Sequence, residues 1–143
     1  MAISTSWPVH LLGIAFGLIF IGFGCYDIVN PEAGLSFFEF TPSLFPSTAA
    51  ETSSLLVVIG IRDIFMGVAI LATLNADQRN VAGWLLIAGS AVAFTDGIVC
   101  YSHGKGAEWN HWGYAPLLTV TGGLLLGWAD GKAKSVDVKA KSQ

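Results

Sequence analysis

Residues 53–74 read SSLLVVIGIRDIFMGVAILATL, and this stretch decides the fold. Its length matches the roughly 20 apolar residues that a helix needs to cross a bilayer core about 30 Å thick. Apolar residues make up 53% of the chain and charged residues 12%, whereas a soluble domain carries about 25% charged residues. The stretch is therefore predicted to be a membrane-spanning helix, although it contains Arg62 and Asp63.

Three more apolar stretches of similar length lie at 7–29, 81–101 and 109–128. The connections at 75–80 and 102–108 are short, so the helices that they join must be antiparallel. The prediction is an all-α protein, an integral membrane antiparallel four-helix bundle over residues 1–131. A disordered basic tail is expected at 132–143. Small residues four apart, as at Gly13 and Gly17 or Gly123 and Gly127, favour close helix packing, and Pro116 is expected to kink the fourth span.

Residues 7–29 have an alternative interpretation as a cleaved signal peptide. No Lys or Arg precedes them, the apolar run is too long, and no small-x-small cleavage site follows. We therefore expect a retained span.

Basic residues near the span ends predict the orientation. Arg79 lies on the same side as the tail lysines Lys132, Lys134, Lys139 and Lys141. Only Lys105 lies on the other side. Both termini are therefore expected in the cytoplasm. Tryptophans are expected to mark the inner interface (Trp7, Trp84, Trp128) and the outer one (Trp109, Trp112).

The connection at 30–52 contains PEAGLSFFEFTPSLFPSTAAE and is too apolar for a solvated loop. Its large apolar residues are Phe37, Phe38, Phe40, Leu44 and Phe45. We expect it to lie in the outer interface. It would serve either as a cap on the bundle or as a lid over a lipophilic site.

Ionisable side chains within the spans are the most informative feature, because such groups are costly in a bilayer and usually face the bundle interior. Arg62 and Asp63 lie roughly 12–15 Å into the second span at about 1.5 Å per residue. Asp27, Asp96 and His111 lie near the outer ends of the other three. Four helices thus contribute polar groups at similar height, which predicts an apolar-walled pocket that opens toward the lumen or the outside.

Arg62 keeps its charge and needs a partner in such a pocket. Asp63 projects about 100° away around the helix, so Asp96 or Asp27 is the better predicted partner. A buried salt bridge that orders the bundle is the structural interpretation. However, a structural ion pair needs only two charges, and this site has more. Several carboxyls beside one guanidinium could also act as a general acid and a general base.

Aromatic and polar residues at the same end are candidate substrate contacts: Tyr101, His103, Trp109, Trp112 and Phe38. Tyr114 is interpreted as an interface aromatic. His103, His111 and Glu108 are residue types that bind metals, but a spacing of eight does not place both histidines on one helix face. We therefore predict no metal, and without a Gly-rich nucleotide loop no cofactor. Cys25 and Cys100 are interpreted as buried free thiols, with a disulfide as the alternative.

The segments GIRDIFMG (60–67) and FTDGIVCYSHGKGAEWNHWGYAPLL (94–118) resemble a family of small fungal and bacterial four-helix membrane proteins. That family is a domain of unknown function, distantly similar to DoxX-like proteins, and the resemblance extends from about Leu12 to Gly127. The matching positions, taken one by one, are Arg62, Asp63, Asp96, His103 and His111. Members are frequent neighbours of secondary-metabolite genes, which implies enzymes that act on lipophilic intermediates.

The leading hypothesis is a membrane enzyme that acts on a lipophilic small molecule by acid–base catalysis, with Asp63, Arg62, Asp96, Asp27 and His111 as catalytic candidates. Epoxide hydrolysis or epoxide-opening cyclisation is favoured. Soluble limonene-epoxide-type hydrolases use an Asp-Arg-Asp set on an unrelated fold, which is an analogy of chemistry alone. Double-bond isomerisation would use the same groups.

Two other function classes stay open: a small proton-coupled transporter and a non-catalytic membrane partner. A carrier should show polar groups across the full depth and an inverted repeat, a symmetry that a homodimer would restore. The expected partners are the lipid bilayer and a lipophilic substrate, with no nucleic acid. In a fungus the expected location is the endoplasmic reticulum.

Overall fold

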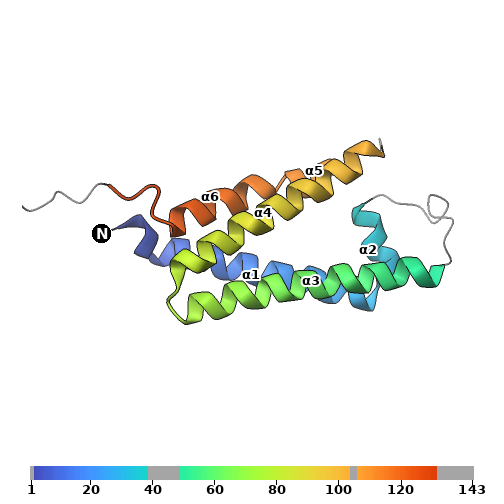
Figure 1. The fold of residues 1–143 in the computed structure, drawn as a ribbon, viewed down its shortest axis with the longest axis horizontal. Coiled ribbons are helices and arrows are strands. Elements are labelled where there is room, and N and C mark those ends of the chain that lie inside the picture. The colour runs from blue at the N-terminus through green and yellow to red at the C-terminus, as the bar shows by residue number, and fades with distance from the viewer. Residues whose placement is uncertain (1, 39–48, 104–105, 132–143) are drawn as a thin grey trace, which may run out of the picture.

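The computed structural model describes residues 2–38, 49–103 and 106–131, and within these ranges the regular structure is entirely helical (Figure 1). The elements in chain order are η1 (Ile3–Thr5), α1 (Trp7–Val29), α2 (Pro31–Phe37), α3 (Ala49–Asn75), α4 (Arg79–Ser102), α5 (Glu108–Trp112) and α6 (Ala115–Leu125). The predicted tail, Lys105 and three residues of the expected interfacial segment (Phe40, Leu44, Phe45) lie outside the described residues.

Three segments are long and apolar enough to cross a membrane: Trp7–Val29, Ser53–Asn75 and Arg79–Ser102. They agree with the first three predicted spans to within two residues at each end. The second span is the apolar part of a longer helix, because α3 begins at Ala49.

The fourth predicted span is not one helix, and this corrects the expectation of a continuous helix over 109–128. Two short helices, α5 and α6, replace it, with Gly113 and Tyr114 between them. In a continuous helix the amide of Pro116 would have to bond to the carbonyl of Trp112, and proline has no N–H. Pro116 instead occupies the first turn of α6, where its missing N–H needs no partner. The expected kink is therefore a break.

The end of α6 also falls earlier than predicted. The helix stops at Leu125, and Gly127 adopts a positive φ of 78°. The amide of Trp128 then bonds to the carbonyl of Gly123 at 3.0 Å, which is the closing bond of a Schellman-type cap. Gly127 therefore ends the helix and does not belong to the predicted packing pattern.

The helices form two packed pairs that run along one another, α1 with α3 and α4 with α5 and α6 (Figure 1). Successive long helices run in opposite directions. The apolar core between the pairs consists of Val9, Phe20, Ile70, Leu74, Ala82, Leu86, Leu118 and Leu125.

Glycines bring the paired backbones close together. A Cβ on Gly60 of α3 would lie 2.6 Å from the carbonyl oxygen of Gly24 in α1. In the second pair, a Cβ on Gly122 of α6 would lie 2.6 Å from the carbonyl oxygen of Gly83 in α4. Close packing through small residues was therefore expected correctly. Gly17, which the four-residue spacing selects, takes part in it, because a Cβ on Gly67 of α3 would overlap the carbonyl oxygen of Gly17, whereas Gly24, Gly60, Gly83 and Gly122 lie outside that spacing.

Polar contacts join the elements at the end of the molecule where the described chain begins and ends. Asp130 accepts hydrogen bonds from the amide and the hydroxyl of Ser4, at 3.0 and 2.5 Å. The Nη1 of Arg79 donates to the carbonyl of Ser4 at 3.1 Å, and its Nε donates to Asp77 at 2.9 Å. Neither cysteine is in a disulfide, but Cys25 is exposed and only Cys100 is buried, so the prediction of two buried thiols is half wrong.

Candidate functional site

A cavity of about 90 Å³ lies between the two helix pairs, in the half of the molecule away from the described ends. Its lining comes from α1, the α2 region, α3, α4 and the α5–α6 segment: Phe16, Ile19, Phe20, Phe23, Asp27, Phe37, Phe38, Ile59, Arg62, Asp63, Asp96, Asn110, His111, Tyr114 and Leu118. The walls are mainly aromatic and aliphatic, and the few polar groups are ionisable except for the amide of Asn110. Such a lining is typical of a small-molecule site.

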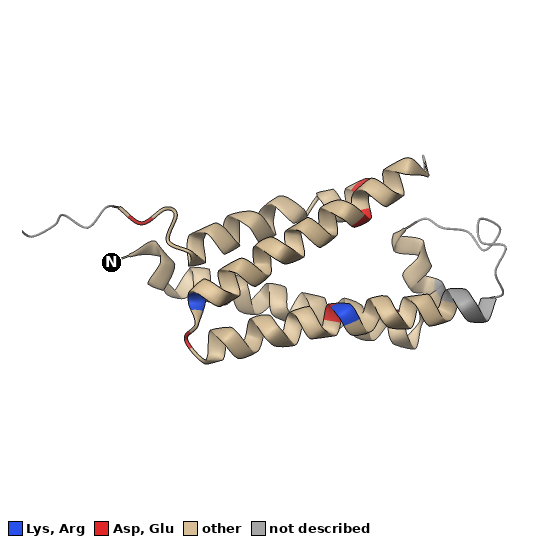
Figure 2. Ribbon diagram, viewed as in Figure 1, with Lys and Arg blue, Asp and Glu red and all other residues tan. Residues whose placement is uncertain are grey.

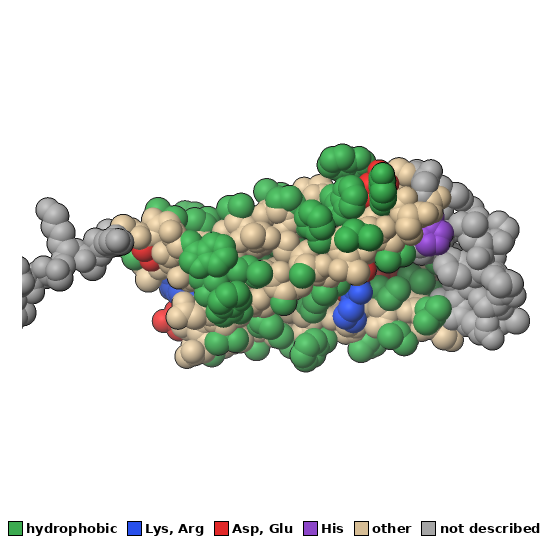
Figure 3. Space-filling model, turned by 45° about the horizontal axis from the view of Figure 1, so that its top comes forward, with side chains coloured by type: hydrophobic (Ala, Val, Ile, Leu, Met, Phe, Trp, Pro, Cys, Tyr) green, Lys and Arg blue, Asp and Glu red, His purple; other side chains and the backbone are tan. Residues whose placement is uncertain are grey.

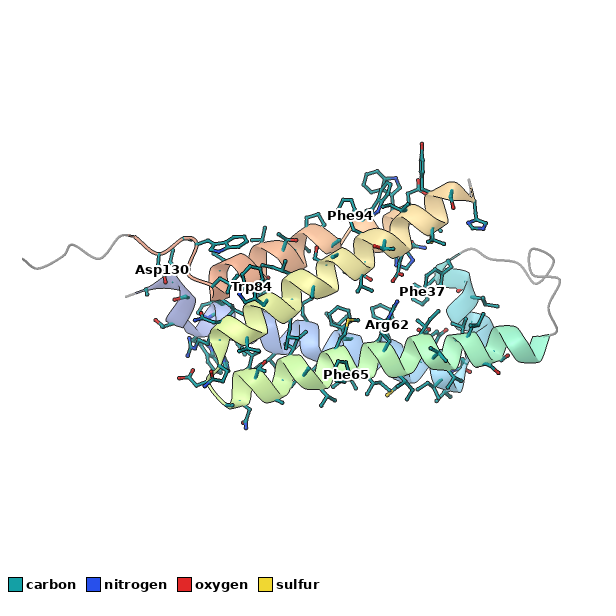
Figure 4. The ribbon with its side chains drawn as sticks, viewed as in Figure 1. Phe37, Arg62, Phe65, Trp84, Phe94 and Asp130 are labelled. Carbon is teal, nitrogen blue, oxygen red and sulfur yellow. The ribbon has the colours of Figure 1, made fainter. Side chains whose placement is uncertain are left out.

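The guanidinium of Arg62 makes two charge-assisted contacts in this cavity. Its Nε donates to Asp63 Oδ1 at 2.9 Å, and its Nη2 donates to Asp96 Oδ2 at 3.2 Å. The second contact crosses from α3 to α4, and Figure 4 shows Arg62 directed toward α4. In the described helices, charged residues away from the molecular ends are few, and a basic and an acidic one lie together at the middle of α3 (Figure 2).

The contact with Asp63 corrects the sequence-based expectation that neighbours about 100° apart on a helix could not meet. The side chain of Arg62 is long enough to turn its Nε toward Asp63 while its terminal nitrogen reaches Asp96. Of the two partners that the sequence proposed, Asp96 is therefore found, and Asp27 makes no ion pair with Arg62 among the described contacts.

Asp27 is the most enclosed carboxyl of the site. It is 5% exposed, and α2 lies directly on it. A Cβ on Gly34 would lie 2.6 Å from Asp27 Oδ1, so only a glycine lets α2 approach this closely. The cavity thus contains three carboxyls and one guanidinium, and the guanidinium is bonded to two of them.

His111 lies in α5 and is 6% exposed. Both of its ring nitrogens are buried and make no hydrogen bond of good geometry to a described residue, although the backbone of Phe37 lies close to the ring. Its ring lies 4.8 Å from that of Phe38, centroid to centroid. The same helix is joined to the end of α2, because Asn110 Nδ2 donates to the carbonyl of Phe37 at 3.1 Å. His111 is therefore a buried polar group that lines the cavity and has no well-formed hydrogen bond to a described residue.

Six of the ten predicted site residues line this cavity: Asp27, Phe38, Arg62, Asp63, Asp96 and His111. Sequence reasoning missed Tyr114, which was interpreted as an interface aromatic, and the aromatic wall of α1. The sequence contains a pattern that indicates this wall. Phe16, Phe20, Phe23 and Asp27 recur every three or four residues and so share one helix face.

The other four predicted substrate contacts do not line the cavity, and this is a correction. Trp112 lies flat on α4, where a Cβ on Gly97 would overlap its ring, and its Nε1 donates to the carbonyl of Phe94 at 3.1 Å. Tyr101 stacks on Trp112 at 5.9 Å, Trp109 is 69% exposed, and His103 caps the exposed end of α4. Figure 4 shows Phe94 on the side of α4 opposite Arg62. The break before α6 turns this face of α5 outward.

No group of three or more His, Cys, Asp or Glu side chains is placed to hold a metal ion within the described ranges. His103, His111 and Glu108, weighed as ligands from the sequence, are therefore not gathered around one point.

Three helices that are long and apolar enough to cross a membrane indicate a helical membrane protein, and a cavity with paired charges lies between them. Residues 17–125 match the family model of a domain of unknown function, DUF4267, and the chain belongs to this family. No curated protein and no solved structure matches the chain.

Proposed function

We propose that the protein is an integral membrane enzyme that opens an epoxide in a lipophilic small molecule by acid–base catalysis without a cofactor. The observation that carries this proposal is the bridge from Asp63 through Arg62 to Asp96 in an aromatic-walled cavity. A guanidinium shared by two carboxyls can keep them in different roles, one accepting a proton and the other donating one.

The reaction balances with these groups alone. Water, or a hydroxyl of the substrate itself, gives its proton to one carboxylate while its oxygen bonds to an epoxide carbon. The ring carbon–oxygen bond breaks with its electron pair on oxygen, and this oxygen takes the proton of the second carboxyl group. Hydrolysis adds one water, and cyclisation leaves the mass unchanged. Proton exchange with solvent then restores both carboxyl groups.

The proposed membrane arrangement has four spans, the fourth made of α5 and α6, with both termini in the cytoplasm. Exposed tryptophans near the two ends of the bundle support the placement across a bilayer: Trp7, Trp84 and Trp128 toward one end and Trp109 toward the other. The cavity would then lie in the lumenal or outer half, in the endoplasmic reticulum of a fungus. A distant relation to DoxX-like proteins and a role in secondary metabolism belong to the same proposal.

The test is turnover by the purified protein in detergent of a panel of lipophilic polyene and terpenoid epoxides, read by mass spectrometry. Asp96→Asn is compared with wild type and with Asp77→Asn, which makes the same change on an 80% exposed side chain far from the cavity. We expect Asp96→Asn to lose about 10²–10⁴-fold in rate, the usual contribution of a general acid or base. Equal rates for wild type and Asp96→Asn would refute the proposed role, and proton-coupled flux in liposomes would then test the transporter alternative.

A further inference from the structure

The polar groups of the cavity differ in how far they are exposed, and this gives the cavity a mouth and a floor. The side chain of Arg62 is 36% exposed, whereas the side chains of Asp63 and Asp96 are only 13% and 18% exposed. Asp27 and His111 are almost fully enclosed. Figure 3 shows a basic side chain at the surface near the middle of the long axis, with hydrophobic side chains close by. The mouth is therefore beside Arg62, and Asp27 and His111 form the floor.

The position of the mouth along α3 decides what can reach it. Arg62 is the middle residue of α3, which runs from Ala49 to Asn75. Its neighbours on the exposed face, Val58, Ile61 and Phe65, are 57–69% exposed and apolar. An opening halfway along a spanning helix faces the hydrocarbon core and not the water at either end. A lipid-dissolved molecule could thus enter from the side.

The size of the cavity limits how much of that molecule enters. About 90 Å³ is less than the roughly 150 Å³ of an engineered cavity that binds benzene. The enclosed part of a ligand is therefore only its end. His111 marks which end, because its buried ring nitrogens make no well-formed hydrogen bond to a described residue and so leave hydrogen-bonding capacity for a ligand.

From these observations we infer that the site takes lipophilic molecules by a terminal oxygen-bearing group. The oxygen bonds to His111 at the floor, and the apolar remainder stays outside the mouth in the bilayer. This inference rests on the proposed function for its reaction, and it narrows the substrate class to lipids and terpenoids with the reacting oxygen near one chain end. It does not depend on turnover for its test.

The test compares two isomeric alcohols as unreactive probes, 1-decanol and 5-decanol, which have the same formula and similar partition into detergent. Each is titrated against the thermal unfolding of the purified protein. We expect the primary alcohol to bind at least tenfold more tightly, because only an unbranched end fits within the cavity and brings its oxygen to His111. We expect His111→Phe, which keeps the ring packing on Phe38, to lose this preference.

The matched control is His103→Phe, since His103 lies outside the cavity on the exposed end of α4 and its replacement should keep the preference. His111→Gln retains hydrogen-bonding groups and should keep part of the preference for the primary alcohol. It replaces His111→Phe in the test if that variant does not fold. Equal binding of the two alcohols by wild type, or an unchanged preference in His111→Phe, would overturn the inference. A clear preference without epoxide turnover would keep the inference and reject only the proposed reaction.

Discussion

Arg62 and Asp96 are joined by a contact of 3.2 Å between Nη2 and Oδ2, although 34 residues separate them in the chain. The contact links α3 of one helix pair to α4 of the other, at the mouth of the cavity. Because Arg62 also bonds to Asp63, a single guanidinium orders two carboxyls and connects two helices. Folding and the proposed chemistry thus depend on the same side chain.

Arg62→Ala should therefore weaken folding as well as abolish function. The substitution leaves Asp63 and Asp96 without their cation, and we expect a loss of about 1–3 kcal/mol, between the ranges for exposed and buried pairs. Thermal unfolding in detergent measures it. Arg62→Lys keeps the charge but cannot bond to both carboxyls in the same way. Its stability should therefore lie between those of wild type and Arg62→Ala. Unfolding of Arg62→Ala that coincides with wild type would show that the pair does not support the fold.

The glycine contact between α1 and α3 predicts a contrast within one helix. A Cβ on Gly24 would overlap the carbonyl of Gly60, whereas a Cβ on Gly22 meets nothing within 4 Å. Gly24→Ala should cost about 1–3 kcal/mol through overpacking. Gly22→Ala should be neutral, or stabilise by up to about 1 kcal/mol, because alanine favours a helix. Unfolding of both variants in the same detergent checks this, and equal effects would contradict the observed packing.

A buried hydroxyl relay joins α4 to the start of α6. Ser90 Oγ donates to the carbonyl of Ala115 at 2.7 Å, and Thr119 Oγ1 donates to Ser90 Oγ at 2.8 Å. Ser90→Ala removes the acceptor of one bond and the donor of the other, and should destabilise by about 1 kcal/mol. Ser102→Ala is the control, since that hydroxyl is exposed and bonds only within its own region. A Ser102→Ala effect as large as that of Ser90→Ala would argue against the relay.

The contact between Asp130 and Ser4 predicts a pH dependence at the end of the molecule away from the cavity. Hydrogen bonds from the hydroxyl and amide of Ser4 hold the pKa of Asp130 below its ordinary value of 3.8. A carboxyl with a lowered folded pKa stabilises the folded state above its unfolded pKa, and this stabilisation is lost as the pH falls through the folded pKa. Below about pH 4 the attachment of η1 should therefore loosen.

Hydrogen exchange of the Ser4 amide measures this attachment. In wild type, the protection of this amide should decrease as the pH is lowered below about 4 and Asp130 becomes protonated. Asp130→Asn should show weaker protection at neutral pH and no such fall, because an amide does not titrate. A Ser4 amide whose protection is independent of pH in wild type would remove the assigned role of Asp130.

The sequence by itself determined the three long apolar helices and the need of Arg62 for a carboxylate from another helix. Both follow from properties that a segment carries on its own, its length and hydropathy, and from the cost of an unpaired charge in lipid. The helical spacing of Phe16, Phe20 and Asp27 also indicates that they share one face of α1.

Only the tertiary structure decided which carboxyls pair with Arg62 and which residues enclose the site. A long side chain can bend back to a neighbour such as Asp63, and helical spacing does not describe that freedom. The break at Pro116 turned Trp112 onto α4 and brought Tyr114 into the cavity, because the direction of a helix after a break depends on what it packs against. Asp27 remained without a guanidinium for the same reason: the choice among partners is made by packing between helices.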